Sequence, residues 1–250
     1  LKQATRPSKD YHNAWNTLFI VIDALELLNG LAINRQPVLL LDSDCVFVRP
    51  IAQKFYDRLD EFGLLRYRLP MDDDVKENGL SNIDLASLAA QYDPPISRNV
   101  IRYAGGEIFF GRADLLPEIT KLARGAYLQS QQRHEMGLMK FNEEAHLLTY
   151  VYELLGSPES SANDFIKRIW TDRGVYSTVT GEEGGLTVWH LPAEKKCGII
   201  KMFRHLGKGG EFPSTVAECA RWFRVQPTAL DRVMMQIKAI ARSIRNRVRG

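Results

Sequence analysis

The apolar positions near the start of the chain change from a helical to a strand-like spacing. Over residues 14–29 the large apolar side chains recur every three or four positions, which predicts a mostly buried helix that stops at Asn29-Gly30. Residues 38–41 are four consecutive aliphatic residues, a pattern typical of a short parallel strand covered on both faces. A helix followed by such a strand indicates the α/β class.

The remaining pattern alternates between predicted helices, strands and one long polar loop. The loop covers residues 70–100 and contains a helical turn near 85–92. Strands at 175–179 and 186–190 are expected to complete the sheet, and Thr215 and Glu218 have the spacing of a capping box. The other predicted elements are helices over 50–62, 115–129, 141–155 and from 228 to the end, and strands over 45–48 and 101–110.

Two aspartates follow the aliphatic run directly. Ligands of open α/β sheets bind beyond the carboxyl ends of strands, where two carboxylates on a tight turn can hold one hard cation. A cation that bridges a diphosphate neutralises the charge growing on a leaving nucleotide. Asp42 and Asp44 are therefore predicted to bind Mn2+ or Mg2+, with Ser43 beside the donor; the alternative is a solvated pair. The acids at 72–74 follow no apolar strand and are typical of a solvated charge run.

The segment over residues 38–48 resembles the aspartate-x-aspartate strand of GT-A-type glycosyltransferases. The segments YAGGEIFFG (103–111) and EEAHLLTY (143–150) resemble, in their order, the sugar-binding strand and acidic-histidine helix of the blood-group-type α-galactosyl and α-N-acetylgalactosaminyl transferases. The resemblance implies a GT-A-like, Rossmann-type mixed sheet flanked by helices over residues 1–210, with a helical basic appendage over 211–250. Family members carry a nucleotide-binding strand before the first helix, so the catalytic domain here is expected to be N-terminally incomplete.

The glutamates of the second motif are the candidate catalytic residues. By resemblance, Glu144 is the nucleophile or the stabiliser of an oxocarbenium-like transition state in a retaining reaction, Glu143 stands beside it, and His146 contacts sugar. Asn142 is a good N-cap, which would put both glutamates in the first helical turn. The helix dipole stabilises anions there by about 0.3–1 kcal/mol. This stabilisation is enough to explain one of the two glutamates without a catalytic role.

The glycine pair of the first motif is the candidate sugar-binding element. Gly105 and Gly106 lack a β-carbon, so a sugar ring can approach the backbone while Glu107 accepts hydrogen bonds from hydroxyls. The alternative is a β-bulge or a tight bend. The small polar residue that the family often has before the pair is replaced by Ala104.

A histidine and two lysines near the C-terminal side complete the candidate donor site. By similarity, His190 is the third metal ligand, and Lys195 or Lys201 contacts the diphosphate. For His190 the alternative is a packed, hydrogen-bonded histidine.

Composition narrows the class of protein. With 250 residues and 45% hydrophobic content the chain can bury one sizeable core, and a net charge of +3 gives no general affinity for nucleic acid. The three cysteines lack metal-ligand spacing, which predicts free thiols in a reducing compartment.

We expect a cytoplasmic protein, at the inner face of a membrane. The last helix supports this because basic residues lie among apolar ones, as on helices that contact anionic lipid; a helix docked on the core is the alternative. Its basic residues are Arg232, Lys238, Arg242, Arg245, Arg247 and Arg249.

Three functions fit these patterns. The leading one is transfer of a sugar, with retention, from a nucleoside diphosphate sugar to a hydroxyl of a glycan or lipid-linked acceptor. A phosphatase of the haloacid dehalogenase type, with Asp42 as nucleophile and Asp44 as acid, is the second, although such enzymes usually continue with Gly-Thr rather than Cys45-Val46. The third is an inactive glycan-binding protein of the same fold.

Overall fold

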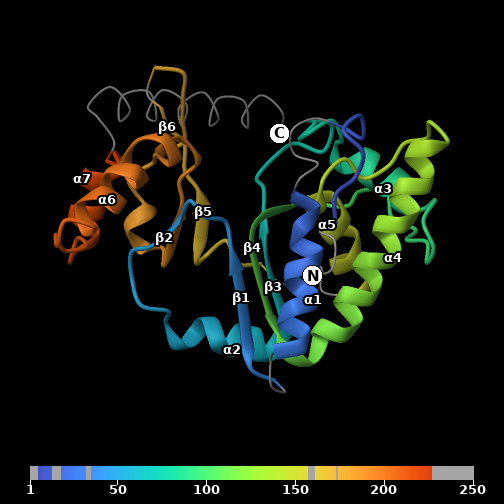
Figure 1. Cartoon of the computed structure of the whole chain (residues 1–250), viewed down its shortest axis with the longest axis horizontal. Helices are drawn as coiled ribbons and strands as arrows, with labels where there is room; N and C mark the ends of the chain where they lie inside the picture. The colour runs from blue at the N-terminus through green and yellow to red at the C-terminus, as the bar shows by residue number, and fades with distance from the viewer. Residues whose placement is uncertain (1–4, 13–17, 32–34, 157–160, 173, 227–250) are drawn as a thin grey trace, which may run out of the picture. The chain divides into compact units, whose positions relative to one another are not determined.

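The computed structural model describes residues 5–12, 18–31, 35–156, 161–172 and 174–226 (Figure 1). Contacts divide the chain into two compact units. The first unit comprises Leu1–Leu41 and Gln53–Asn163, and the second unit comprises Asp42–Ala52 and Asp164–Gly250. Both units contain a small open sheet with helices, so the fold is mixed α/β, as predicted. The functional division at residue 210 stays a prediction.

The first unit is built on a three-stranded antiparallel sheet. The strands are β1 (Pro37–Leu41), β4 (Ala104–Arg112) and β3 (Leu64–Arg68), in the order β1-β4-β3. The prediction of a parallel strand covered on both faces is therefore wrong for β1, which is an antiparallel edge strand with Val38 as its one buried residue. A continuous apolar run indicates that a strand packs on a core, but it carries no information about the direction of its partner.

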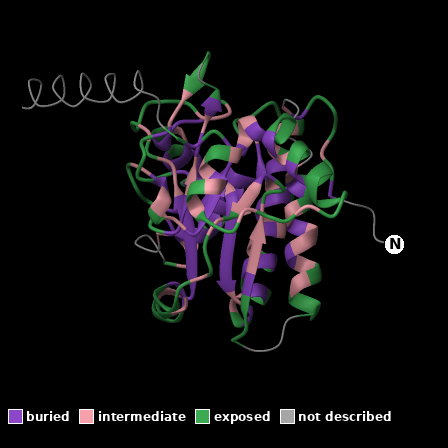
Figure 2. Ribbon diagram, turned by 90° about the vertical axis from the view of Figure 1, so that its left-hand side faces the viewer, coloured by how far each residue is buried: buried purple, intermediate pink, exposed green. Residues whose placement is uncertain are grey.

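In its described residues the first unit also contains five α-helices: α1 (Ile20–Leu31), α2 (Gln53–Phe62), α3 (Asn82–Ala89), α4 (Leu116–Glu135) and α5 (Glu144–Leu154). The periodic patterns predicted α1, α2, α4 and α5, with ends that differ by a few residues. Residues 14–17 of the first prediction lie outside the described residues. The helical turn expected inside the polar loop is a full helix, α3, because Ser81 and Asp84 form a capping box at its start. Buried residues follow the strands and the inner faces of the helices (Figure 2).

The second unit has its own sheet and hairpin. Its sheet has the order β2-β8-β5, in which β2 (Cys45–Phe47) is antiparallel and β5 (Ile166–Arg168) is parallel to β8 (Val188–His190). The strands β6 (Thr171–Asp172) and β7 (Tyr176–Ser177) pair only with each other. The expectation that the segments at 175–179 and 186–190 complete one sheet is therefore wrong, since β7 pairs locally with the strand just before it.

Helices and a compact core complete the second unit. Trp189 and Leu191 are fully buried and pack with residues of α6 (Gly198–Leu206) and α7 (Val216–Trp222). The predicted capping box of Thr215 and Glu218 is confirmed at the start of α7. The predicted basic helix from residue 228 lies outside the described residues. No helix among those described is both long and apolar enough to cross a membrane.

Candidate metal centre and glutamate cluster

The three predicted metal ligands gather in the second unit, where β2 and β8 lie side by side. Asp42 and Asp44 precede β2, and His190 ends β8 directly opposite Cys45. One ligand atom from each of the three lies within 4.8 Å of the other two. His190 Nε2 is 3.5 Å from Asp42 Oδ2 and 3.4 Å from Asp44 Oδ1. A carboxylate pair and an imidazole at this spacing can hold a divalent metal ion.

Backbone hydrogen bonds fix the ligands before any metal binds. The Cys45 N–H donates to the Asp42 carbonyl at 3.0 Å and closes the turn, and the Leu191 N–H donates to the Asp44 carbonyl at 3.0 Å. On the other side of β8, the Ile169 N–H donates to the His190 carbonyl at 2.8 Å. The turn and the strand end are therefore tied together, which favours a preformed site.

Asp44 has the electrostatics of a metal ligand. Its side chain is 2% exposed, and Lys195 Nζ lies 3.3 Å from Oδ2. Oδ1 accepts no hydrogen bond of ordinary geometry, and its 3.4 Å separation from His190 Nε2 is an ion-pair distance. Burial raises the pKa of Asp44, but the nearby His190 imidazole and the Lys195 ammonium outweigh burial and lower it overall. Asp44 therefore offers a buried, ionised carboxylate oxygen to a cation, and the residues present fit a metal.

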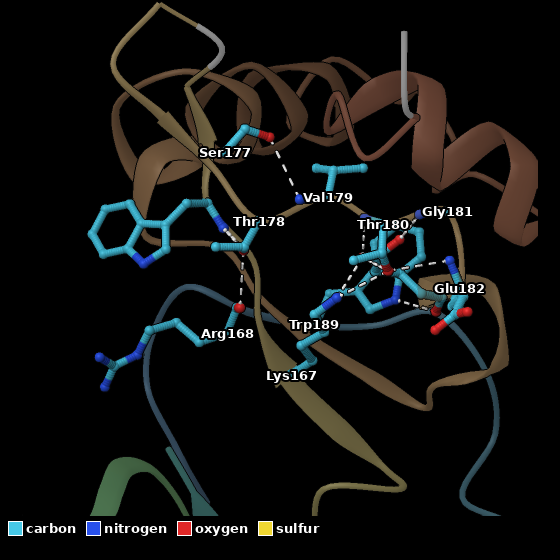
Figure 3. Close-up of polar contacts among 11 residues, drawn as sticks. Lys167, Arg168, Ser177, Thr178, Val179, Thr180, Gly181, Glu182 and Trp189 are labelled. Atoms are coloured by element: carbon cyan, nitrogen blue, oxygen red, sulfur yellow. Dashed lines mark hydrogen bonds and ion pairs between the residues drawn. The ribbon is translucent and has the colours of Figure 1, made fainter. Parts of the chain in front are cut away.

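A buried network holds β8 in place next to the ligands (Figure 3). Trp189 is fully buried, and its indole Nε1 donates to the Glu183 carbonyl at 2.8 Å. The Glu183 carboxylate accepts hydrogen bonds from Lys167 Nζ and from the Thr180 N–H, both at 2.6 Å. Glu183 therefore links two neighbouring strands, because its carboxylate contacts Lys167 of β5 and its backbone carbonyl contacts Trp189 of β8. No local sequence pattern predicts this network, because its members come from three separate segments of the chain.

The Glu183 carboxylate is expected to make stability depend on pH. Burial raises its pKa, but the hydrogen bonds from Lys167 and Thr180 outweigh burial, so the pKa lies below the ordinary value of 4.5. A depressed pKa stabilises the fold above that value, and this contribution is lost as the pH falls through the lower folded-state pKa. Glu183→Gln should therefore lower the free energy of unfolding at neutral pH by about 1–3 kcal/mol.

Urea unfolding of both proteins over a pH series measures this effect. The difference between wild type and Glu183→Gln should shrink as the pH is lowered below 4.5. Glu182→Gln changes an exposed neighbour and should match wild type throughout. A difference that does not vary with pH would contradict the assigned ionisation of Glu183.

The second group of predicted residues gathers in the first unit, at a bulge in β4. The register shifts between Arg66 and Tyr67 of β3, so the alternative of a β-bulge at the glycine pair is confirmed. A β-carbon at Gly106 would lie 2.6 Å from Glu144 Oε1, and one at Gly105 would collide with the Glu107 carboxylate. The glycines therefore make room for two buried carboxylates. The sugar contact assigned to them, and to Glu107, stays a prediction.

Glu143 and Glu144 have different surroundings. The prediction that Asn142 is the N-cap is wrong, because Glu143 takes that position with extended backbone. The Asn142 amide instead donates to the Asn78 carbonyl at 3.0 Å. Glu143 Oε1 accepts from the Tyr103 hydroxyl at 2.6 Å, and Oε2 accepts from Asn78 Nδ2 at 2.5 Å. Glu144 alone therefore lies in the first helical turn.

His146 is a packed, neutral histidine. It is completely buried, and burial lowers its pKa to about 3. Its Nε2 lies 3.1 Å from the Glu77 carbonyl, which can only accept, so Nε2 carries the proton. The same atom is 3.6 Å from Glu143 Oε1, as expected for residues on one face of a helix. The sugar contact that the resemblance implies for His146 stays a prediction.

The remaining predicted residues lie in the second unit. Ser43 is exposed in the turn between the two aspartates, and Lys201 is exposed on α6. Of the two candidate lysines, Lys195 is the one whose ammonium the structure places at Asp44.

No protein-family model matches the chain, and no curated protein matches it significantly. The roles of these residues therefore rest on their geometry and on the resemblance of their motifs.

Proposed function

We propose that the protein is a metal-dependent glycosyltransferase of the GT-A type, which moves a sugar from a nucleoside diphosphate sugar to an acceptor hydroxyl. The observation that carries this proposal is the cluster of Asp42, Asp44 and His190 directly after an aliphatic strand, with a lysine beside it. Two carboxylates and an imidazole suit Mn2+ or Mg2+. A neighbouring ammonium suits the diphosphate that such a cation would bridge.

The residues of the second unit would bind the donor. Asp42, Asp44 and His190 would hold the cation, which supplies positive charge for the departing nucleoside diphosphate. Lys195 is 55% exposed, so its ammonium can reach a diphosphate oxygen while remaining near Asp44. Ser43 and Lys201 are the further candidate contacts.

Of the two glutamates, we assign the reaction to Glu144. Both oxygens of Glu143 accept hydrogen bonds that fix the start of α5, from Tyr103 and from Asn78. This explains the conformation of Glu143 without a substrate. Glu144 would stabilise positive charge at the anomeric carbon, and retention of configuration follows from the resemblance to the blood-group-type enzymes. The acceptor would be a glycan or a lipid-linked hydroxyl, reached at the inner face of a membrane.

A thermal-shift screen, which measures the unfolding temperature with nucleoside diphosphates and nucleotide sugars in the presence and absence of Mn2+, tests the proposal. A true donor at 100 times its dissociation constant should stabilise the protein by about 2.7 kcal/mol, and only in the presence of Mn2+. The shift should vanish in Asp44→Asn. Glu144→Gln should keep the shift but lose release of free nucleoside diphosphate in the presence of acceptor, whereas Glu118→Gln, an exposed control, should keep both.

The same screen separates the other two functions. Hydrolysis of p-nitrophenyl phosphate without any response to nucleotide sugars would select the phosphatase and reject the transferase. Donor-dependent stabilisation with no turnover against any acceptor would select a glycan-binding protein. A donor shift that survives in Asp44→Asn would show that the cluster does not bridge the diphosphate.

A further inference from the structure

A polar cavity of about 390 Å³ lies wholly within the first unit and contains none of the residues assigned above. Four arginines and two acids line it: Arg66, Arg68, Arg98, Arg102, Asp73 and Glu153. Its size falls at the lower end of the range for small-molecule sites, roughly 300–1,000 Å³.

One wall of the cavity is a strand with a fixed backbone. Arg66 and Arg68 lie two positions apart on β3, so their side chains leave the same face. The Ala162 N–H donates to the Arg66 carbonyl at 2.8 Å. Asn163 brackets Arg68, since its Oδ1 accepts from the Arg68 N–H at 2.9 Å and its Nδ2 donates to the Arg68 carbonyl at 2.7 Å. The backbone of both arginines is therefore held in place before any ligand binds.

A second wall of the cavity is formed by the segment before β4, which supplies two further arginines. Arg98 and Arg102 precede β4 at even spacing, and Arg102 is exposed at the cavity. Arg98 Nε lies 3.3 Å from Glu153 Oε2, while Arg66 Nη2 lies 2.8 Å from Glu153 Oε1. A single carboxylate of α5 is thus shared between guanidinium groups from both walls.

The charges of the lining do not cancel. Four guanidinium groups face two carboxylates, which leaves an excess of two positive charges. One of the carboxylates, Asp73, also accepts a hydrogen bond from Asn82 Nδ2 at 3.0 Å. Arg66 is 1% exposed, so solvent screens its charge little. The cavity therefore favours a dianion.

We infer that this cavity binds the phosphate group of a small phosphorylated molecule. A phosphate monoester carries a charge of about −1.5 to −2 at neutral pH, which matches the excess. Guanidinium groups bind phosphate oxygens through paired, charge-assisted hydrogen bonds. The cavity is larger than a phosphate ion, so a compact carbon skeleton fits beside it. This site is independent of the proposed transferase activity.

Calorimetric titration in the presence of EDTA tests the inference, because the chelator removes any divalent cation from the metal centre. The probes are inorganic phosphate, ribose 5-phosphate, ribose and malonate, all at one ionic strength set with chloride. We expect ribose 5-phosphate to bind at least as tightly as phosphate, and ribose not to bind. Arg102→Gln should weaken phosphate binding about tenfold, because it removes one charge-assisted contact. Arg6→Gln, an exposed arginine of the same unit, should leave it unchanged.

Several results would overturn the inference. Phosphate affinity that is equal in wild type and in the double variant Arg98→Gln with Arg102→Gln would exclude the cavity. Loss of phosphate binding in Asp44→Asn, a residue of the second unit, would place the anion at the metal centre instead. Tighter binding of malonate than of either phosphate compound would assign the cavity to a dicarboxylate.

Discussion

Asp44→Asn should weaken Mn2+ binding by more than 100-fold in the absence of any nucleotide. Asp44 is the buried carboxylate of the cluster, and its Oδ1 lies 3.4 Å from the imidazole that would share the metal. Asparagine keeps the shape but removes the negative charge that a hard cation requires. Loss of a second-shell partner alone costs roughly 10–100-fold in metal affinity, so loss of a direct ligand should exceed that range. Calorimetric titration with Mn2+ measures the effect.

Two comparisons make this result specific. Asp74→Asn changes an exposed acid of the loop that follows β3, away from the three ligands, and it should bind Mn2+ like wild type. His190→Gln should also weaken binding, because it removes the third ligand of the cluster. If Asp44→Asn and wild type had equal affinities while both remained folded by circular dichroism, the cluster would not be the metal site.

Glu153→Gln should lower the free energy of unfolding by about 3–5 kcal/mol. Glu153 and Arg66 form an ion pair at 2.8 Å, and their side chains are only 4% and 1% exposed. Removing the carboxylate leaves the charge of Arg66, whose side chain is almost fully buried, without this ion pair, which costs more than the pair itself contributes. Arg98, which also contacts Glu153, is 46% exposed and can be hydrated after the change. Urea unfolding monitored by tryptophan fluorescence measures the loss.

A double variant separates the buried charge from simple loss of packing. Arg66→Met combined with Glu153→Leu removes both charges and should be more stable than Glu153→Gln alone. Glu211→Gln, an exposed glutamate, should match wild type. If Glu153→Gln lowered the free energy of unfolding by less than about 1 kcal/mol, the pair would contribute no more than an exposed ion pair does, and the expected cost of a buried charge would be contradicted.

The helices were predictable from sequence because their apolar periodicity is a local property. The patterns at 115–129 and 141–155 correspond to α4 and α5, with shifts only at the ends. Strand pairing was not predictable in the same way. The aliphatic run of β1 indicated a strand, but its antiparallel partner β4 comes from far along the chain. The segments of β7 and β8 look alike in sequence, yet one forms a local hairpin and the other the centre of a sheet.

The candidate site was predictable where a motif carries it. Asp42 and Asp44 are two positions apart in sequence, and resemblance pointed to His190, which the structure brings to them. Two features with large physical effects gave no such signal. One is Glu183, which connects Lys167 of β5 to Trp189 of β8, and the other is the group of arginines around Glu153. Both are assembled from segments that no local pattern connects. Arg66 and Arg68 are two positions apart and Arg98 and Arg102 are four apart, and neither spacing is a motif that predicts a cavity.

The bulge in β4 restricts which amino acids can occupy positions 105 and 107. At Gly105 the volume that a methyl group would need is filled by the carboxylate of Glu107, two positions along the same strand. Any larger residue at 105 thus requires a shorter or reoriented partner at 107. Natural variants of this chain should therefore change these two positions jointly, and an alanine at 105 should occur together with a shorter residue in place of Glu107.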